Sequence, residues 1–198
     1  VKKYKGKENI RLIFHNAGYD IRFIFKYLTH PVLIERGKML LRGYGKFYYG
    51  KGKYIDVQIQ DSYSIIPSPL RDFKAMFNLE IEKEILPYGL YTEYNVKKCF
   101  IPLVDCIKEV RHQYTKNNIG KKINKEEEEE FVNDYIKNIK KWKCLDGNNL
   151  VDIIKYSSEY CKLDVKVLQR GYSIFKDKII DITARGEDVD EDDDSLGN

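Results

Sequence analysis

The sequence predicts an α/β fold with a mixed β-sheet and a mostly helical insertion. Residues 10–14 form a short apolar run bounded by polar residues, which is typical of a buried strand. A segment with helical spacing follows, and then two strand-like segments joined by a loop that contains two glycines. The rest of the chain consists mainly of segments with helical periodicity. This order of elements favours a sheet that is combined with helices in one α/β domain.

The strands and the first helix are expected in the first third of the chain. Residues 20–28 place apolar side chains at the spacing of one helix face, and Pro31 follows where that helix ends. Residues 39–60 have the composition of β-structure, and residues 50–53 form the loop of a hairpin. These segments together predict the sheet and a helix that packs on it.

Helices are expected in most of the remaining chain. After a Pro-Ser-Pro turn, residues 70–77 are typical of a short amphipathic helix, with Ser68 or Asp61 as its cap. Longer helices are predicted at residues 102–114, 125–142 and 150–175. Residues 91–145 form the predicted helical insertion.

Charge divides the chain into a basic body and an acidic tail. Residues 184–198 hold seven acids and one base, a charge of −6, so the total of +4 leaves +10 on residues 1–183. A basic body fits a polyanionic partner such as DNA, and a generic Lys-rich surface is the alternative. We expect residues 1–183 to form one domain and the tail to be disordered.

Composition excludes several classes of protein. The mean hydropathy of -0.54 and the lack of an apolar run of about 18 residues exclude a membrane span. The basic, polar start at Val1 excludes a signal peptide in this stretch and indicates that an upstream portion is missing. The four cysteines lack the spacing of a zinc site, which favours free thiols in a reducing, intracellular compartment.

Two short motifs carry candidate catalytic residues. Asn16 and Asp20 lie where the first strand meets the helix, the kind of strand end at which α/β proteins place their sites. Helix capping is the alternative for this pair, with Asn16 as the cap and Asp20 as an acid in the first turn. Tyr160 and Asp164 lie one turn apart on one face of the last helix, where a structural role is the alternative.

In this order the two motifs resemble the second and third exonuclease motifs of family B DNA polymerases. Two further segments extend the resemblance, which covers roughly residues 11–175. Ser62 and Tyr63 are similar to a Ser-Leu pair that contacts the single-stranded primer end in protein-primed members, and Tyr63 is able to stack on a base instead. Lys83, with Tyr88 beyond it, is similar to their Lys-x-x-hydrophobic motif.

The resemblance implies an RNase H-like 3′→5′ exonuclease core that removes mispaired nucleotides during DNA replication. It implies that Asp20 and Asp164 hold two Mg²⁺ or Mn²⁺ ions, which activate a water and stabilise the leaving oxygen. Tyr160 would orient the water, and Lys83 would support catalysis. The residues expected to contact single-stranded DNA are Asn16, Tyr19, Ser62, Tyr63 and Tyr88. The family also implies a viral, linear-plasmid or organellar origin and a possible terminal protein as primer.

The sequence departs from this family in one respect. No Asp-x-Glu motif, which supplies further metal ligands, precedes the first strand, and the motifs of a polymerase domain are absent. We therefore expect a fragment or a decayed gene, incomplete at its N-terminal end and with little exonuclease activity by itself. The alternatives are a degenerate module that binds single-stranded DNA without cutting it, and a separate exonuclease of the same superfamily.

Overall fold

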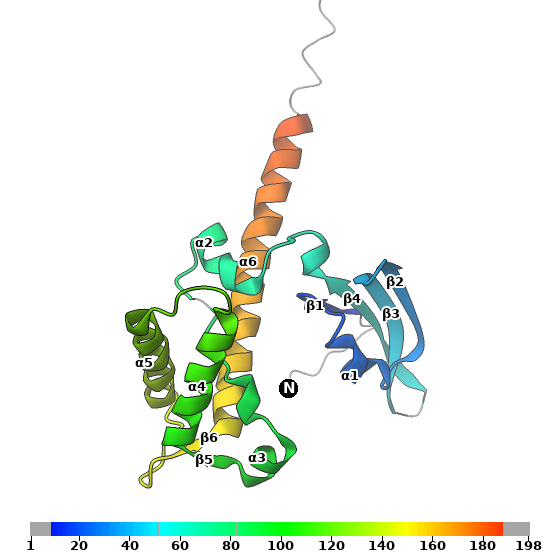
Figure 1. Ribbon diagram of the computed structural model, residues 1–198. Helices are drawn as coiled ribbons and strands as arrows, with labels where there is room; N and C mark the ends of the chain where they lie inside the picture. The colour runs from blue at the N-terminus through cyan, green and yellow to red at the C-terminus, as the bar shows by residue number, and fades with distance from the viewer. Residues whose placement is uncertain (1–8, 51, 82, 188–198) are drawn as a thin grey trace, which may run out of the picture. The chain divides into compact units, whose positions relative to one another are not determined.

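The computed structural model describes residues 9–50, 52–81 and 83–187 (Figure 1). The chain divides into two units. The sheet unit consists of Val1–Leu79 together with Leu168–Asn198, and the helical unit is Glu80–Val167. The predicted insertion at residues 91–145 lies inside the helical unit.

The sheet unit contains a four-stranded mixed sheet, which confirms the predicted α/β class. Its strands are β1 (Asn9–Phe14), β2 (Thr29–Arg36), β3 (Met39–Gly50) and β4 (Lys53–Asp61), in the order β1-β4-β3-β2 (Figure 1). β1 and β4 are parallel, and the other neighbours are antiparallel. The parallel register places Phe14 opposite Asp61, so both strands end at the same edge of the sheet.

One face of the sheet is covered by α1 (Ile21–Phe25), which is shorter than the predicted helix at residues 20–28. The core residues of this face are Ala17, Ile21, Leu40, Val57 and Ile59. A Cβ at Gly45 would lie 3.0 Å from the Leu28 side chain, so glycine allows Leu28 to pack directly on β3. Burial of these apolar side chains joins the helix to the sheet.

β2 is a strand that the sequence did not predict. Among the described strands it lies at one edge of the sheet, and it contains Pro31. Proline cannot donate a backbone hydrogen bond, and edge strands tolerate it because one side of the strand has no partner. Val32 and Ile34 are exposed while Pro31 and Leu33 are half-buried, so burial alternates along the strand but apolar residues occupy both faces, which hides the strand pattern in the sequence.

The sheet unit also contains α2 (Phe73–Phe77), which begins with the 3-10 turn η2 (Leu70–Asp72). This confirms the helix predicted at residues 70–77. The predicted cap is wrong, because neither turn has a side-chain cap of the kind expected from Ser68 or Asp61. Asp61 instead caps the earlier 3-10 turn η1 (Ser62–Ser64) by accepting a hydrogen bond from the Tyr63 amide.

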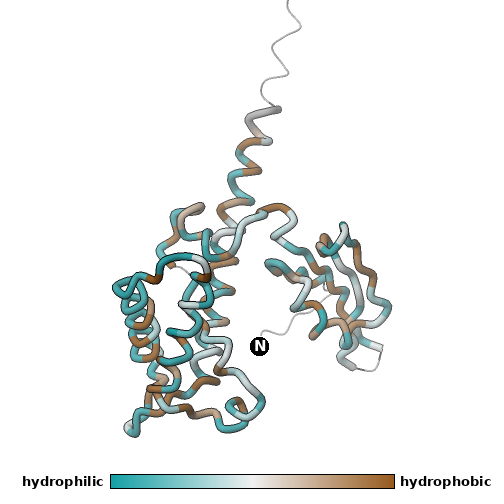
Figure 2. The backbone as a smooth tube through the Cα atoms, in the orientation of Figure 1, coloured by the Kyte–Doolittle hydropathy of each residue, from teal (hydrophilic) through white to brown (hydrophobic). Residues whose placement is uncertain are grey.

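The helical unit is built from four α-helices and a small antiparallel sheet among the residues that the structure describes. Its elements are η3 (Tyr88–Leu90), α3 (Glu93–Lys98), β5 (Phe100–Pro102), α4 (Leu103–Asn117), α5 (Lys125–Lys141), β6 (Leu150–Asp152) and the start of α6 (Ile153–Glu187). Hydrophobic and hydrophilic residues alternate along α5 (Figure 2). The buried face of these helices gathers Val110, Tyr135, Ile139 and Tyr156.

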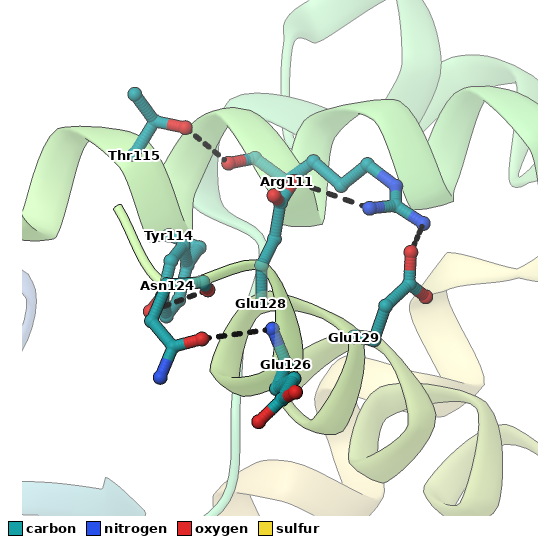
Figure 3. A network of polar contacts seen from close by, with 7 residues as sticks. All are labelled: Arg111, Tyr114, Thr115, Asn124, Glu126, Glu128 and Glu129. Atoms are coloured by element: carbon teal, nitrogen blue, oxygen red, sulfur yellow. Dashed lines mark hydrogen bonds and ion pairs between the residues drawn. The ribbon is translucent and has the colours of Figure 1, made fainter. Parts of the chain in front are cut away.

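Polar contacts join α4 to α5 at the surface (Figure 3). Arg111 of α4 donates to Glu128 at 3.2 Å and to Glu129 at 2.6 Å. Asn124 caps α5, because its side-chain oxygen accepts a hydrogen bond from the Glu126 amide. The acidic start of α5 therefore pairs with the neighbouring helix and suits the helix dipole.

α6 extends further than the predicted helix at residues 150–175. It begins at Ile153, because residues 150–152 form β6, and it continues to Glu187. Residues 184–187, which the sequence assigned to the disordered tail, are therefore helical, and residues 188–198 lie outside the described residues. None of the helices in the described part of the chain combines the length and hydrophobicity of a membrane-spanning segment.

Candidate active site

Lys83 and Asp164 form an ion pair in the helical unit. The Lys83 Nζ lies 2.7 Å from Asp164 Oδ2, and the two side chains are only 27% and 22% exposed. The other carboxylate oxygen of Asp164, Oδ1, is buried and has no hydrogen-bond partner among the described residues. A buried carboxylate oxygen without a partner is costly, and the Tyr160 hydroxyl, which interacts with Asp164, is able to donate to this carboxylate.

Tyr160 lies one helical turn before Asp164 on α6 and is 4% exposed. The Lys83 Nζ lies 5.0 Å from the centroid of the Tyr160 ring. Burial raises the pKa of the Tyr160 hydroxyl, and the neighbouring Asp164 and Tyr88 raise it further. The hydroxyl therefore keeps its proton at neutral pH and is able to donate as well as accept a hydrogen bond.

Hydrogen bonds hold the segment that carries Lys83 against its helical neighbours. The Glu84 side chain accepts a 2.7 Å hydrogen bond from Asn138 of α5, and the Tyr156 hydroxyl donates to the Ile85 carbonyl at 2.8 Å. Asn138 and Tyr156 are both buried. These bonds position an otherwise irregular segment, so Lys83 lies beside Asp164 without regular secondary structure of its own.

In the sheet unit, the loop after β1 is fixed by a buried carboxylate. Asp61 is 2% exposed, and its two carboxylate oxygens accept hydrogen bonds from the amides of Asn16 and Ala17, both at 2.8 Å. The Tyr63 amide adds a third bond at 3.0 Å. Asn16 has the left-handed φ of 63°, a conformation that asparagine tolerates better than most residues. Asp61 therefore determines the path of the loop that contains Asn16 and Asp20.

His15 and Ser62 form a second set of contacts below this loop. The Ser62 hydroxyl donates to the Phe14 carbonyl at 2.7 Å and lies 2.9 Å from His15 Nδ1. His15 Nε2 lies 2.8 Å from the Ser68 carbonyl, which only accepts, so this nitrogen carries a proton. These contacts give His15 a structural role, in which it joins the end of β1 to the segment at Ser62 and Ser68.

Ser62 is fully buried, so its hydroxyl does not reach the surface in this structure. Its direct contact with DNA stays a prediction, and burial favours an indirect role in which Ser62 positions the neighbouring loop. Tyr63 is half-buried and packs its ring edge against His15, with 5.4 Å between ring centroids. Asn16 and Tyr19 are exposed, as expected of residues that contact a ligand.

Asp20 immediately precedes α1, yet its side chain makes no capping hydrogen bond. The capping alternative is therefore wrong in its detail, because the cap position is Asp20 and not Asn16, and Asp20 does not lie in the first turn. Partial desolvation raises the pKa of the Asp20 carboxyl, a backbone hydrogen bond at Asp20 opposes the rise, and repulsion from Asp61 adds to it. The carboxylate of Asp20, just before α1, and that of Asp61, at the end of β4, therefore repel each other.

Asp20 should destabilise the folded protein at neutral pH. The pKa of the Asp20 carboxyl is raised above the ordinary 3.8 in the folded protein, so the folded state binds this proton more tightly than the unfolded state does. The resulting contribution to stability is complete below pH 3.8 and is lost as the pH rises through the folded pKa. We expect Asp20→Asn to increase the free energy of unfolding at pH 7, with a gain that shrinks as pH falls toward 3.8. Urea unfolding between pH 4 and 7 measures this gain. Asp181→Asn, at an exposed position of α6, is the matched control, and a gain independent of pH would contradict the assignment.

The structure brings together some of the predicted site residues. Lys83, Tyr88, Tyr160 and Asp164 gather in the helical unit, and Asn16, Tyr19, Asp20, Ser62 and Tyr63 belong to the sheet unit. The convergence of Asp20 with Asp164 stays a prediction. Among the described residues, no three His, Cys, Asp or Glu side chains form a group able to hold a metal ion.

Asp61 fixes the loop of this candidate site and was not predicted as a site residue, since the sequence favoured it only as a cap for a later helix. The sequence offers one signal for it, which is that Asp61 directly follows the predicted β-structure at residues 39–60. Asp61 is the last residue of a strand that runs parallel to β1, and parallel neighbours end at the same edge of a sheet. The pairing of these two strands is not visible without the structure.

The sequence matches the family described as DNA polymerase type B, organellar and viral, over residues 3–189. No curated protein and no solved structure gives a significant match to the chain.

Proposed function

Because the chain belongs to the organellar and viral type B DNA polymerases, we propose that it forms the 3′→5′ exonuclease region of such an enzyme. The substrate of this region is the single-stranded 3′ end of DNA, from which it removes mispaired nucleotides. The ion pair between Lys83 and Asp164, with Tyr160 beside it, is the observation that carries this proposal. Three residues that the motifs assign to one reaction lie in contact, although they come from two separate segments.

The chemistry of Asp164 supports a role as a metal ligand. Hard divalent ions such as Mg²⁺ prefer carboxylate oxygens, and Asp164 Oδ1 is a buried carboxylate oxygen that lacks a partner among the described residues. Bound Mg²⁺ or Mn²⁺ would lower the pKa of a water and neutralise charge on the phosphate. Asp164 would supply only part of the ligand set that two ions need, so waters, the DNA phosphate and further acids would complete it.

The neighbouring residues have roles that their surroundings support. The Tyr160 hydroxyl is protonated at neutral pH, as an ordinary tyrosine is, and burial raises its pKa further, so it is able to hold and orient a water next to Asp164. The Lys83 ammonium offsets negative charge that develops on the phosphate during hydrolysis. Asn16, Tyr19, Tyr63 and Tyr88 would contact the DNA strand, with the aromatic rings stacking on bases.

We extend this proposal to the fold and to the primer. The parallel pair β1 and β4, with candidate site residues at the ends of both strands, supports an RNase H-like core. From the family resemblance we also propose that a terminal protein serves as primer and that the enzyme acts inside the cell. The alternative of a degenerate DNA-binding module is not favoured, since the family consists of polymerases.

A nuclease assay on the intact gene product tests the proposal. We expect an oligonucleotide labelled at its 5′ end to shorten stepwise from its 3′ end when Mg²⁺ is present, and to remain intact in EDTA. A mispaired 3′ nucleotide on a duplex should leave faster than a paired one, because its strand is already separated. Internal cleavage, or shortening that persists in EDTA, would overturn the exonuclease assignment.

Lys83→Met should lower the rate of hydrolysis by about 10²-fold with a small change in KM, since the lost charge acts mainly in the transition state. Methionine keeps the length and apolar stem of the side chain. Lys166→Met, at an exposed position of α6 in the same unit, removes one charge elsewhere and serves as the control. Equal losses in both variants would show that general charge, and not Lys83 itself, supports the reaction.

A further inference from the structure

The sheet unit presents a second surface, on the face of the sheet opposite α1. Side chains alternate between the two faces of a strand, and Val57 and Ile59 point into the core beneath α1. The neighbouring positions of β4 and their cross-strand partners therefore share the other face. We call it the polar sheet face, and its residues are Asn9, Arg11, Ile13, Arg42, Tyr44, Lys46, Tyr48, Tyr54, Asp56, Gln58 and Gln60.

The register of the strands arranges this face in rows. Tyr44 of β3 pairs with Gln58 of β4, which pairs with Arg11 of β1. In the next row Arg42 of β3 pairs with Gln60 of β4, which pairs with Ile13 of β1. Each row thus combines a cationic group with a carboxamide, and the two rows lie side by side.

These two rows border a hollow of about 260 Å³. Among the described residues that line it, none is acidic, and Tyr172 of α6 contributes a phenol from the same unit. Neither Arg11 nor Arg42 forms an ion pair within the described part of the chain. Two guanidinium groups without a carboxylate partner fit an anion, and their planar forks match phosphate oxygens.

Aromatic side chains continue the polar sheet face toward the end of the hairpin. Tyr44, Tyr48 and Tyr54 are 37%, 48% and 38% exposed. The Lys46 Nζ lies 4.3 Å from the centroid of the Tyr54 ring, and the Tyr48 and Tyr54 rings are 5.6 Å apart. Exposed rings interleaved with cations are suited to a strand that presents bases and phosphates alternately.

We propose that the polar sheet face binds single-stranded nucleic acid, with phosphates on Arg11 and Arg42 and bases stacked on the exposed tyrosines. Three cations against one acid, Asp56, make the face positive, which matches a polyanion. The carboxamides of Gln58 and Gln60 are able to donate to and accept from base edges. This binding uses none of the proposed nuclease residues, so it stands whether or not the chain cuts DNA.

Fluorescence anisotropy of a labelled 20-nucleotide single strand, titrated with the full chain in EDTA, tests this proposal separately from nuclease activity. The double variant Arg11→Gln, Arg42→Gln should weaken binding about tenfold or more. Loss of two phosphate contacts should also reduce the slope of log K against log salt by about 1.4. The variant Arg11→Lys, Arg42→Lys keeps the charge and should retain most of the salt slope.

Two further variants complete the test. Lys121→Gln, Lys122→Gln removes the same charge from an exposed loop of the helical unit and should leave the affinity near wild-type. Tyr48→Leu should weaken binding about tenfold by loss of base stacking. Equal affinity of wild-type and the arginine double variant would overturn the proposal and point to a protein partner for this face. Absence of binding by wild-type at low salt would overturn it as well.

Discussion

Asp164→Ala is expected to lower the rate of 3′→5′ hydrolysis by about 10³-fold or more, with DNA affinity close to wild-type. The alanine removes the buried carboxylate that we propose as a metal ligand, and loss of several kcal/mol of charge stabilisation corresponds to this factor. The proposed DNA contacts come from other residues, so binding should survive. Single-turnover release of the 3′ nucleotide, measured beside anisotropy, separates the two effects.

Asp181→Ala is the matched control for this experiment, since it removes an exposed acid from the same helix. Tyr160→Phe should cost only about tenfold, because it removes a hydroxyl that orients water and leaves the carboxylate in place. A variant without Asp164 also leaves Lys83 without its partner at 2.7 Å, so thermal unfolding must show that the variant is folded. Hydrolysis by folded Asp164→Ala at the wild-type rate would rule out Asp164 as a ligand.

The fold was predictable where side-chain pattern alone determines the element. The apolar run of β1, the glycine-containing hairpin of β3 and β4, and the amphipathic α4 and α5 all follow from local periodicity. β5 and β6 were not predictable, because each has three residues and exists through pairing with the other. β2 contains a proline, and its strand conformation depends on β3 alone among the described residues.

The candidate site, like β5 and β6, depends on contacts between distant segments that local sequence pattern does not predict. Lys83 and Asp164 were predicted through the family resemblance, and no spacing in the sequence connects two residues so far apart. The structure adds the reason for their contact, which is the segment held by Asn138 and Tyr156. Asp61 was missed because its partners are backbone amides, and hydrogen bonds to backbone groups leave no pattern in side chains.

Asp61→Ala should lower the free energy of unfolding of the sheet unit by about 3 kcal/mol or more. Three amides would lose a charged acceptor, and each buried donor without a partner costs about 1–3 kcal/mol. Asp61→Asn should cost less, because its carbonyl oxygen still accepts while its amide nitrogen faces a donor. Hydrogen exchange of the Asn16, Ala17 and Tyr63 amides reports the change locally, and urea unfolding reports it globally.

Asp72→Ala, which removes an exposed acid from the same unit, should change neither measurement by more than about 0.5 kcal/mol. The loop that Asp61 fixes also contains Asp20, so relaxed loop geometry should reduce hydrolysis although Asp61 itself contacts no substrate. The loss should therefore appear in both Asp61 variants in proportion to amide exchange, with Asp61→Asn less affected than Asp61→Ala. If hydrolysis falls while the Asn16 and Ala17 amides stay protected, Asp61 acts on the reaction directly and its role as a positioning residue is wrong.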